Sequence, residues 1–320
     1  MTCNEKSRVI YKKDDLEVDY ELLSWHKVIR RYWTRGFLGN LKNVKTTFSD
    51  YVFKGTWGRL FRLSRADGLQ KAFSPYFFFF WLLLILFGCS YFIWTSLTGQ
   101  VSWITLFALL SFGVVNLLLY LGLDKLNLFW VNRIMDFFVR YSKREVPLVL
   151  QAESHFKAKV LSALDSGEYD EVVLVAHSVG TILCLSIMAE LAEEGLGEGL
   201  TVVTLGHCVS GVSILPEAIW FNDKLKRISL RQFKWIDVTS GKDAVTFYKV
   251  TPAYHAEILP DLTLSAGFHE IFDKRFYASL KWDFYQIHFL YLYNPQHPEN
   301  SLFNYQKLLF DAGVFKRLLK

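Results

Sequence analysis

The sequence EVVLVAHSVGTILCLSIMAEL, residues 171–191, decides the fold of this chain. Residues 172–176 form a continuous apolar run rich in β-branched side chains, which is typical of a strand covered on both faces. From Thr181 to Leu191, apolar residues recur at helical spacing. The residues between the two patterns are Ala-His-Ser-Val-Gly, so the stretch predicts a strand, a tight turn and a helix.

The turn fits the pattern Gly-x-Ser-x-Gly, in which the serine lies at a sharp bend between strand and helix. Such a bend favours small residues two positions before and two after the serine. Ala176 and Gly180 meet this requirement, with alanine in place of the first glycine. The pattern predicts Ser178 as a nucleophile, with the N–H of Val179 facing an oxyanion at the helix start. The alternative is an ordinary strand-turn-helix unit in which Ser178 caps the helix.

The composition is more apolar than that of an ordinary soluble protein. Of the 320 residues, 52% are hydrophobic, 17% aromatic and 21% charged, and the mean hydropathy is +0.18. We therefore expect part of the chain to lie in a membrane. Cys3, Cys89, Cys184 and Cys208 show no paired spacing, so we expect no disulfide framework, no metal site and no cofactor. The polar N-terminal residues show no secretory signal, and no nucleic-acid-binding motif is visible.

Residues 72–123 contain no charged side chain and divide at Leu97-Thr98-Gly99-Gln100 into two apolar halves. The halves, 76–97 and 101–123, each have about 20 residues, enough for a helix to cross a ~30 Å hydrocarbon core. Their tryptophans and tyrosines lie mostly toward the ends, as interfacial aromatic residues do. The interval predicts a transmembrane hairpin of two helices. The alternative is a buried helical pair inside a soluble protein.

Lysines and arginines flank the predicted hairpin on both sides, whereas its connecting turn carries none. They are Lys54, Arg59, Arg62, Arg65 and Lys71 before it and Lys125, Arg133, Arg140, Lys143 and Arg144 after it. By the positive-inside rule both flanks are cytoplasmic. The net charge of +5 then mainly reflects residues that face anionic lipid.

Strand and helix patterns alternate after the hairpin. Amphipathic or apolar helical patterns cover 126–141 and 149–164, and β-branched runs like that of the elbow recur at 200–205 and 235–238. This alternation indicates an α/β fold with a mostly parallel sheet and helices on both faces. A possible strand at 16–23 is expected to pair into the same sheet. The chain then divides into an N-terminal segment, 1–71, which belongs to the main domain, the hairpin, 72–123, and the remaining domain, 124–320.

A nucleophilic serine needs a histidine base and an acid that orients it, and after an elbow of this kind the acid precedes the histidine in the chain. The strand at 235–238 leads into a loop in which Asp243 lies at the position expected for the acid. Asp237 competes, but within the strand it favours a structural hydrogen bond. Asp223 and Asp261 are further alternatives.

Four histidines follow this loop, and spacing alone does not choose among them: His255, His269, His288 and His297. His297 lies in a turn-like Asn-Pro-Gln-His-Pro sequence, and His269 precedes a charged segment. His288 is surrounded by aromatic residues, which could exclude water and bring its imidazole near an apolar substrate. A histidine among aromatic residues is also typical of a protein core.

Three blocks besides the elbow have a distinctive sequence. They are Thr204-Leu205-Gly206-His207 with Leu215-Pro216, Trp235-Ile236-Asp237-Val238 with Asp243 and Val245, and Ile287-His288-Phe289 with Tyr291. Together with Leu22-Leu23-Ser24-Trp25-His26 and the basic run before the hairpin, they resemble bacterial membrane-associated α/β-hydrolases of the serine lipase and esterase kind. The resemblance covers most of the chain, although only the elbow is specific by itself. It implies an α/β-hydrolase fold with Ser178 as nucleophile, Asp243 as acid and His288 as base.

One feature departs from that family. Such hydrolases usually begin with a strand and a glycine-containing loop that supplies a second oxyanion N–H. No such loop precedes Trp25, and the first glycine is Gly36. Since one missing donor lowers turnover by about 10²–10³, a non-catalytic membrane protein that uses the fold as an interaction module is the alternative function.

The sequence therefore predicts a membrane-anchored serine hydrolase that cleaves a lipid or other acyl ester through an acyl-enzyme. The substrate is expected to arrive from the cytoplasmic leaflet, and the aromatic residues of 268–293 are expected to contact its acyl chain. A thioesterase or a peptidase would use the same three residues, so the leaving group stays open.

Overall fold

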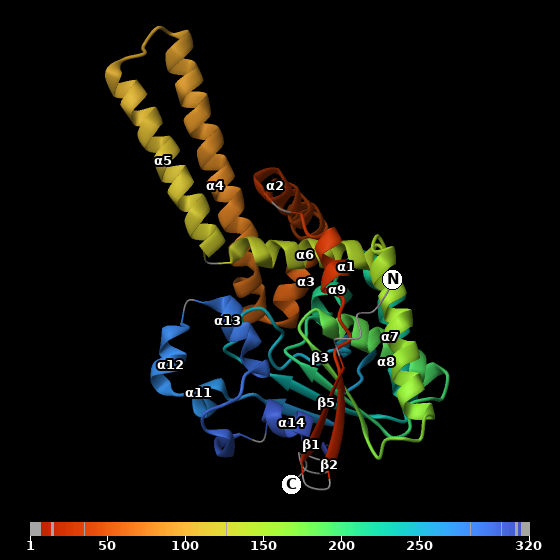
Figure 1. Ribbon diagram of the computed structural model, residues 1–320. Coiled ribbons are helices and arrows are strands. Elements are labelled where there is room, and N and C mark those ends of the chain that lie inside the picture. The colour runs from red at the N-terminus through yellow and green to blue at the C-terminus, as the bar shows by residue number, and fades with distance from the viewer. Residues whose placement is uncertain are drawn as a thin grey trace.

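The computed structural model describes residues 8–13, 16–34, 36–125, 127–281, 283–301, 303–310 and 313–314. A hairpin of two long helices projects from an α/β body (Figure 1). Residues 1–7, which include Cys3 and most of the polar N-terminus, lie outside the described residues, as does Leu126, the expected first residue of a helix.

A sheet of four parallel strands forms the centre of the body, in the order β3-β4-β5-β6. The strands are β3 (Val172–His177), β4 (Leu200–Leu205), β5 (Lys234–Thr239) and β6 (Leu262–Ser265). The α/β class and the parallel sheet are confirmed, and the first three strands lie where the apolar runs predict them. Ala176 pairs with Thr204, and Thr204 pairs with Asp237, so the carboxyl ends of these three strands lie side by side.

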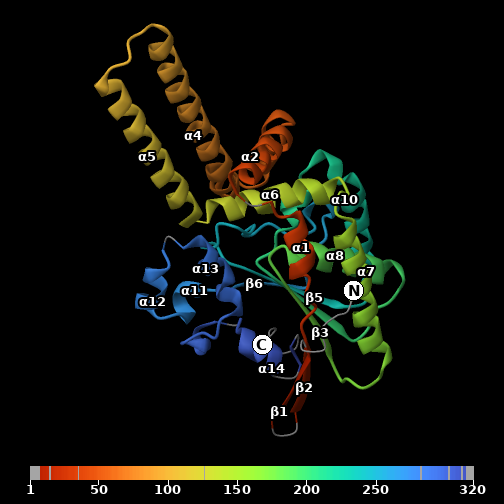
Figure 2. The ribbon, with the colours of Figure 1, turned by 45° about the horizontal axis from the view of Figure 1, so that its top comes forward.

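Helices cover both faces of this sheet, as expected (Figure 2). Val202 and Trp235 face one hydrophobic cluster, whereas the neighbouring Val203 and Ile236 face the other, because successive side chains of a strand point to opposite faces. The helices of the first cluster are α6 (Leu128–Ser142), α7 (Pro147–Asp165), α8 (Gly180–Glu193), α9 (Val209–Ser213) and α10 (Ile219–Lys226). Those of the second are α11 (Phe268–Ile271), α12 (Lys274–Ser279), α13 (Phe284–Phe289) and α14 (Tyr305–Phe310).

Short helical turns complete the body. They are the π-helix η2 (Phe48–Phe53) and the 3₁₀ turns η3 (Pro216–Ala218), η4 (Arg227–Leu230), η5 (Tyr254–Ala256), η6 (Leu290–Leu292) and η7 (Pro298–Asn300).

The N-terminal segment joins the body through helices and not through the main sheet. Its strands β1 (Arg8–Lys13) and β2 (Leu16–Glu21) pair with each other in a separate antiparallel sheet, so the expected pairing of 16–23 into the main sheet is wrong. The reason is the sequence LEVDYE of β2, which alternates acidic and apolar residues, whereas a strand of a covered parallel sheet is apolar on both faces. The helices α1 (His26–Tyr32) and α3 (Thr56–Leu63) nevertheless contribute Val28, Trp57 and Leu60 to the first hydrophobic cluster.

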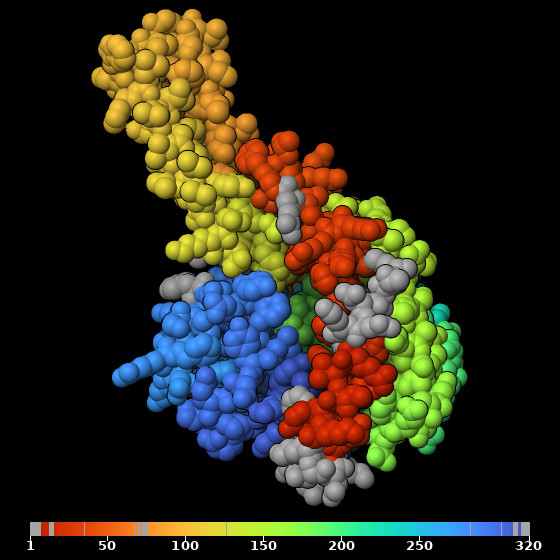
Figure 3. All heavy atoms as spheres, viewed as in Figure 1, coloured from red at the N-terminus to blue at the C-terminus, as the bar shows by residue number. Residues whose placement is uncertain are grey.

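The hairpin consists of α4 (Arg65–Leu97) and α5 (Trp103–Lys125). Two stretches, Tyr76–Leu97 and Trp103–Lys125, have a mean hydropathy of 2.2 and are long and apolar enough to cross a membrane. In the most apolar 18-residue window of each stretch, only 11% and 0% of the residues are buried within the protein, so the pair is not packed in a soluble core (Figure 3). Within the hairpin, Trp81 Nε1 donates a hydrogen bond to Asn116 Oδ1 at 2.8 Å.

Candidate active site

Ser178 lies at a strained bend between β3 and α8. Its φ is +58°, in the left-handed region that non-glycine residues rarely adopt. Two contacts hold this conformation: the Ser178 N–H donates to the Leu205 carbonyl at 3.0 Å, and Thr181 Oγ1 donates to the Ser178 carbonyl at 2.5 Å. The sequence pattern predicts that position 180 needs a small residue. No contact with another element explains this, since a Cβ added at Gly180 meets nothing within 4 Å.

The structure brings the three predicted site residues into one hydrogen-bonded chain. His288 Nε2 lies 2.6 Å from Ser178 Oγ, and His288 Nδ1 lies 2.8 Å from Asp243 Oδ2. An ionised carboxylate only accepts hydrogen bonds, so Nδ1 carries the ring hydrogen and donates it to Asp243. Nε2 is then the acceptor for the Ser178 hydroxyl hydrogen, which is the arrangement that a general base needs.

Asp243 is a buried carboxylate that stays ionised. Burial by itself would raise its pKa, but His288 and the Val245 N–H, which donates to Oδ1 at 3.0 Å, outweigh that effect and hold the pKa below its usual range. The side chain is only 3% exposed. Asp243 therefore keeps a fixed negative charge beside His288 at neutral pH.

Protein atoms close the site on most sides. Ser178 is 9% exposed and His288 is 0% exposed. The Trp130 ring of α6 lies 5.5 Å from the His288 ring, and the Tyr285 ring of α13 lies 5.1 Å from that of Trp130. The imidazole of His288 is therefore shielded from water, and only a small part of Ser178 reaches the surface.

The other predicted carboxylates have structural partners. Asp237 Oδ1 accepts a hydrogen bond from Thr204 Oγ1 at 2.6 Å, and burial raises the Asp237 pKa. Asp261 Oδ2 accepts from the Trp235 backbone N–H at 2.8 Å. Asp223 pairs with Lys226 at the surface. Asp243 is thus the one of the four that the structure brings to His288.

The other predicted histidines lie at or near the surface. His269 and His297 have exposed side chains that pair with acidic neighbours, Glu270 and Asp273 respectively. The His255 ring lies 3.9 Å from the ring of Tyr254. Among the described residues, no group of three or more His, Cys, Asp or Glu side chains is arranged to hold a metal ion.

His177 is a member of the site that sequence reasoning missed. Its Nε2–H donates to the backbone carbonyl of His288 at 2.9 Å, and the two imidazole rings lie 4.7 Å apart. Burial and the nearby His288 lower the His177 pKa to about 3, so the ring is neutral at physiological pH. His177 is visible in the elbow motif, but its partner is 111 residues away in the sequence, so no local pattern reveals the contact.

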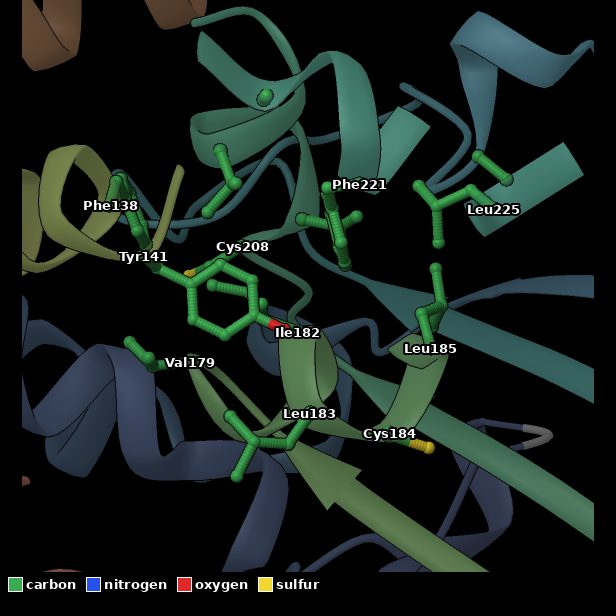
Figure 4. Packing of buried hydrophobic residues seen from close by; sticks show 14 of the residues in the cluster. Phe138, Tyr141, Val179, Ile182, Leu183, Cys184, Leu185, Cys208, Phe221 and Leu225 are labelled. Atoms are coloured by element: carbon green, nitrogen blue, oxygen red, sulfur yellow. The ribbon is translucent and has the colours of Figure 1, made fainter. Parts of the chain in front are cut away.

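The predicted oxyanion donor lies at the start of α8. Val179 follows Ser178 directly, in the first turn, where backbone N–H groups lack acceptors within the helix. Figure 4 shows Val179 beside Ile182 and Cys208, within the buried cluster. Cys208 Sγ lies 3.9 Å from Ser178 Oγ, and the Cys208 N–H is occupied by Thr181 Oγ1 at 3.1 Å. The main sheet of the described residues begins with β3, and no strand of that sheet supplies a second donor from the N-terminal side.

Comparisons with known proteins add no assignment. The chain matches no protein-family model, no curated protein and no solved structure at a significant level. The geometry of this chain is therefore what indicates its function.

Proposed function

We propose that this protein is a membrane-anchored serine hydrolase with an α/β-hydrolase fold, which cleaves acyl esters through an acyl-enzyme intermediate. The observation that carries the proposal is the hydrogen-bonded chain from Ser178 through His288 to Asp243, with distances of 2.6 and 2.8 Å. This is the arrangement of a nucleophile, its general base and the acid that orients the base.

Each residue has a defined role in the proposed reaction. His288 Nε2 takes the proton of Ser178, whose oxygen attacks the ester carbonyl, while the Val179 N–H stabilises the oxyanion. The negative charge of Asp243 stabilises the imidazolium ion, which then gives its proton to the leaving alcohol. A water molecule, activated by the same nitrogen, releases the acid from the acyl-enzyme.

Two further observations support the proposed fold and substrate. The nucleophile, acid and base follow β3, β5 and β6 in the chain order of α/β-hydrolases. The acid loop contacts the hairpin directly, because Lys71 Nζ of α4 donates to the Thr246 carbonyl at 2.8 Å. A site this close to the hairpin suits an ester in the cytoplasmic leaflet, where the positive-inside rule places the body.

The test is labelling of the detergent-solubilised full chain with a fluorophosphonate probe. We expect the wild type and His269→Ala to be labelled, because His269 is exposed and paired with Glu270. Ser178→Ala is expected to lose labelling, and His288→Ala and Asp243→Asn are expected to reduce it sharply. Labelling of the wild type would then justify a screen of lipid esters, thioesters and peptides to identify the leaving group.

A non-catalytic interaction module is the second candidate function. Two observations favour it: Ser178 is only 9% exposed, and the main sheet has no strand before β3 among the described residues. A folded wild-type sample that is no more labelled than Ser178→Ala would make this the better assignment.

A further inference from the structure

Helix α2 (Gly36–Thr47) carries large apolar side chains on its outer face and polar ones on its inner face. Phe37, Leu38 and Leu41 are 50%, 78% and 37% exposed, whereas Asn40 and Asn43 are 5% and 0% exposed. A surface helix of a water-soluble protein has the opposite arrangement, with its apolar stripe toward the core.

The exposed and buried residues occupy separate arcs around the helix axis. At about 100° per residue, Phe37, Leu38 and Leu41 fall within one arc of about 140° together with Lys42 and Lys45, which are also exposed. The buried residues fall within a second arc of about 100°, which Val44 borders next to Phe37, and they are Asn40, Asn43, Val44 and Thr47. The orientation is therefore a property of the whole helix and not of one side chain.

This orientation is costly if the outer face meets water. Among the described residues, Asn40 Oδ1, Asn43 Nδ2 and Thr47 Oγ1 are buried without a hydrogen-bond partner. Each such group costs roughly 1–3 kcal/mol, and the exposed leucines and phenylalanine forgo the gain of burial. An apolar medium outside the helix removes the cost of exposing the leucines and the phenylalanine to water.

Helix α2 packs against the base of the hairpin, and Phe37 brings its outer face to the same place. The Phe37 ring lies 6.4 Å from the ring of Tyr120 in α5, and Val44 shares a hydrophobic cluster with Trp81 and Leu123 of the hairpin. Just beyond α2, the Phe48 ring stacks on that of Phe79 in α4 at 4.8 Å. Figures 1 and 2 show α2 beside the lower part of the hairpin, and Figure 3 shows its atoms on the surface there.

We propose that α2 is a third membrane-contacting element, which lies in the interface of the same leaflet as the hairpin base. Phe37, Leu38 and Leu41 enter the boundary between head groups and acyl chains, to a depth of about 5–10 Å. The exposed ammonium groups of Lys42 and Lys45 face the phosphates of anionic lipids. The inference rests on the proposed insertion of the hairpin, and it assigns a lipid surface as the partner of α2.

The test is site-directed spin labelling of the full chain in nanodiscs of phosphatidylcholine and phosphatidylglycerol. Cys3 and Cys89 are first replaced by serine, while Cys184 and Cys208 stay because both are buried. A nitroxide is placed at Leu38→Cys, and its collisions with oxygen, which dissolves in lipid, and with a water-soluble nickel complex are compared.

Two reference sites calibrate the measurement. Leu110→Cys in α5, 67% exposed, reports a position in the lipid, and Leu230→Cys, 63% exposed, reports water. Leu230 lies just before the amino end of β5. The candidate site and its contact with the hairpin lie at the carboxyl ends of the strands, on the opposite side of the sheet. We expect the oxygen-to-nickel collision ratio at position 38 to lie between those at positions 110 and 230 and well above that at position 230, because an interfacial side chain lies at a shallower depth than the middle of α5.

Three results would overturn the inference. A ratio at position 38 equal to that at position 230 would place the outer face of α2 in water. Low collision rates with both reagents would show that protein, such as a second copy of the chain, covers it. A water-like ratio at position 110 would show that the hairpin itself is outside the bilayer, in which case the membrane part of the proposed function fails as well.

Discussion

The rings of His177 and His288 lie in contact at an angle of 37°, and His177 stays neutral at physiological pH because its pKa is lowered to about 3. Its hydrogen bond to the His288 carbonyl positions the base. We expect His177→Leu to lower kcat about tenfold, the worth of one lost hydrogen bond of ~1–1.5 kcal/mol, with little change in KM. His177→Gln keeps an N–H donor near the Nε2 position and should recover most of the loss. Steady-state kinetics on an ester substrate would check this, and equal losses in both variants would reduce His177 to a packing role.

Asp243 makes the stability of the fold depend on pH in a predictable direction. Its pKa is lower in the folded protein than in the unfolded chain, where it is about 3.9. The carboxylate therefore stabilises the fold above pH ~4, and this contribution is lost as the pH falls through the folded pKa. We expect the difference in unfolding free energy between wild type and Asp243→Asn to shrink when denaturation is measured at pH 3.5 instead of pH ~7. Asp223→Asn, at an exposed site, should differ from wild type by no more than about 0.5 kcal/mol. A difference that does not change with pH would contradict the lowered pKa.

At the residue scale, two of the three candidate site residues follow from local sequence patterns, although they lie far apart in the chain. The elbow pattern identifies Ser178, and the position after a strand favours Asp243 over Asp237. The residue pattern does not identify the base, because four histidines follow the loop. Only the family resemblance selects His288. The contacts of His177 and Trp130 with His288 depend on tertiary packing, which a local pattern does not encode.

At the element scale, helices α6 and α9 meet at a glycine. A Cβ added at Gly211 would lie 2.3 Å from Cε2 of Phe138, a side chain that is only 4% exposed. We expect Gly211→Ala to destabilise the protein by about 1–3 kcal/mol, as overpacking of a core does. Chemical denaturation of the solubilised protein measures this, with Gly58→Ala in α3 as the matched control. No atom lies within 4 Å of a Cβ at Gly58, so alanine should stabilise the helix there by up to about 1 kcal/mol. Equal stability of the two variants would mean that Phe138 moves freely.

Elements with one strong pattern were predictable, and elements with mixed patterns were not. The strand predicted at 200–205 is β4 within the same bounds, and the helix predicted at 149–164 is the main part of α7. By contrast, β6 has only four residues, LTLS, which are too short and too polar to stand out. Helix α2 also gives a weak pattern, because its large apolar side chains point outward and most of its buried side chains are polar.

At the scale of the whole molecule, the arrangement of basic residues predicts the orientation in the membrane. Gln100→Cys, in the turn of the hairpin, should react with a membrane-impermeant maleimide in intact cells, because the turn carries no charge and is therefore predicted to lie outside. Leu230→Cys should react only after the cells are permeabilised. Both variants need Cys3 and Cys89 replaced by serine. The reverse labelling pattern would place the body on the outer side of the membrane.

Helix α4 is continuous from Arg65 to Leu97, and Lys71 near its start contacts the body. Lys71 donates to the Thr246 carbonyl, and its ammonium group lies 4.1 Å from the centre of the Phe247 ring. Both residues follow Asp243 closely in the same loop. Transmembrane helices change their tilt when the hydrocarbon thickness changes. In the proposed membrane-anchored enzyme, a different tilt would displace Lys71 relative to this loop, so the thickness of the bilayer would affect the alignment of the proposed acid. A soluble truncation that removes the hairpin would lose that connection.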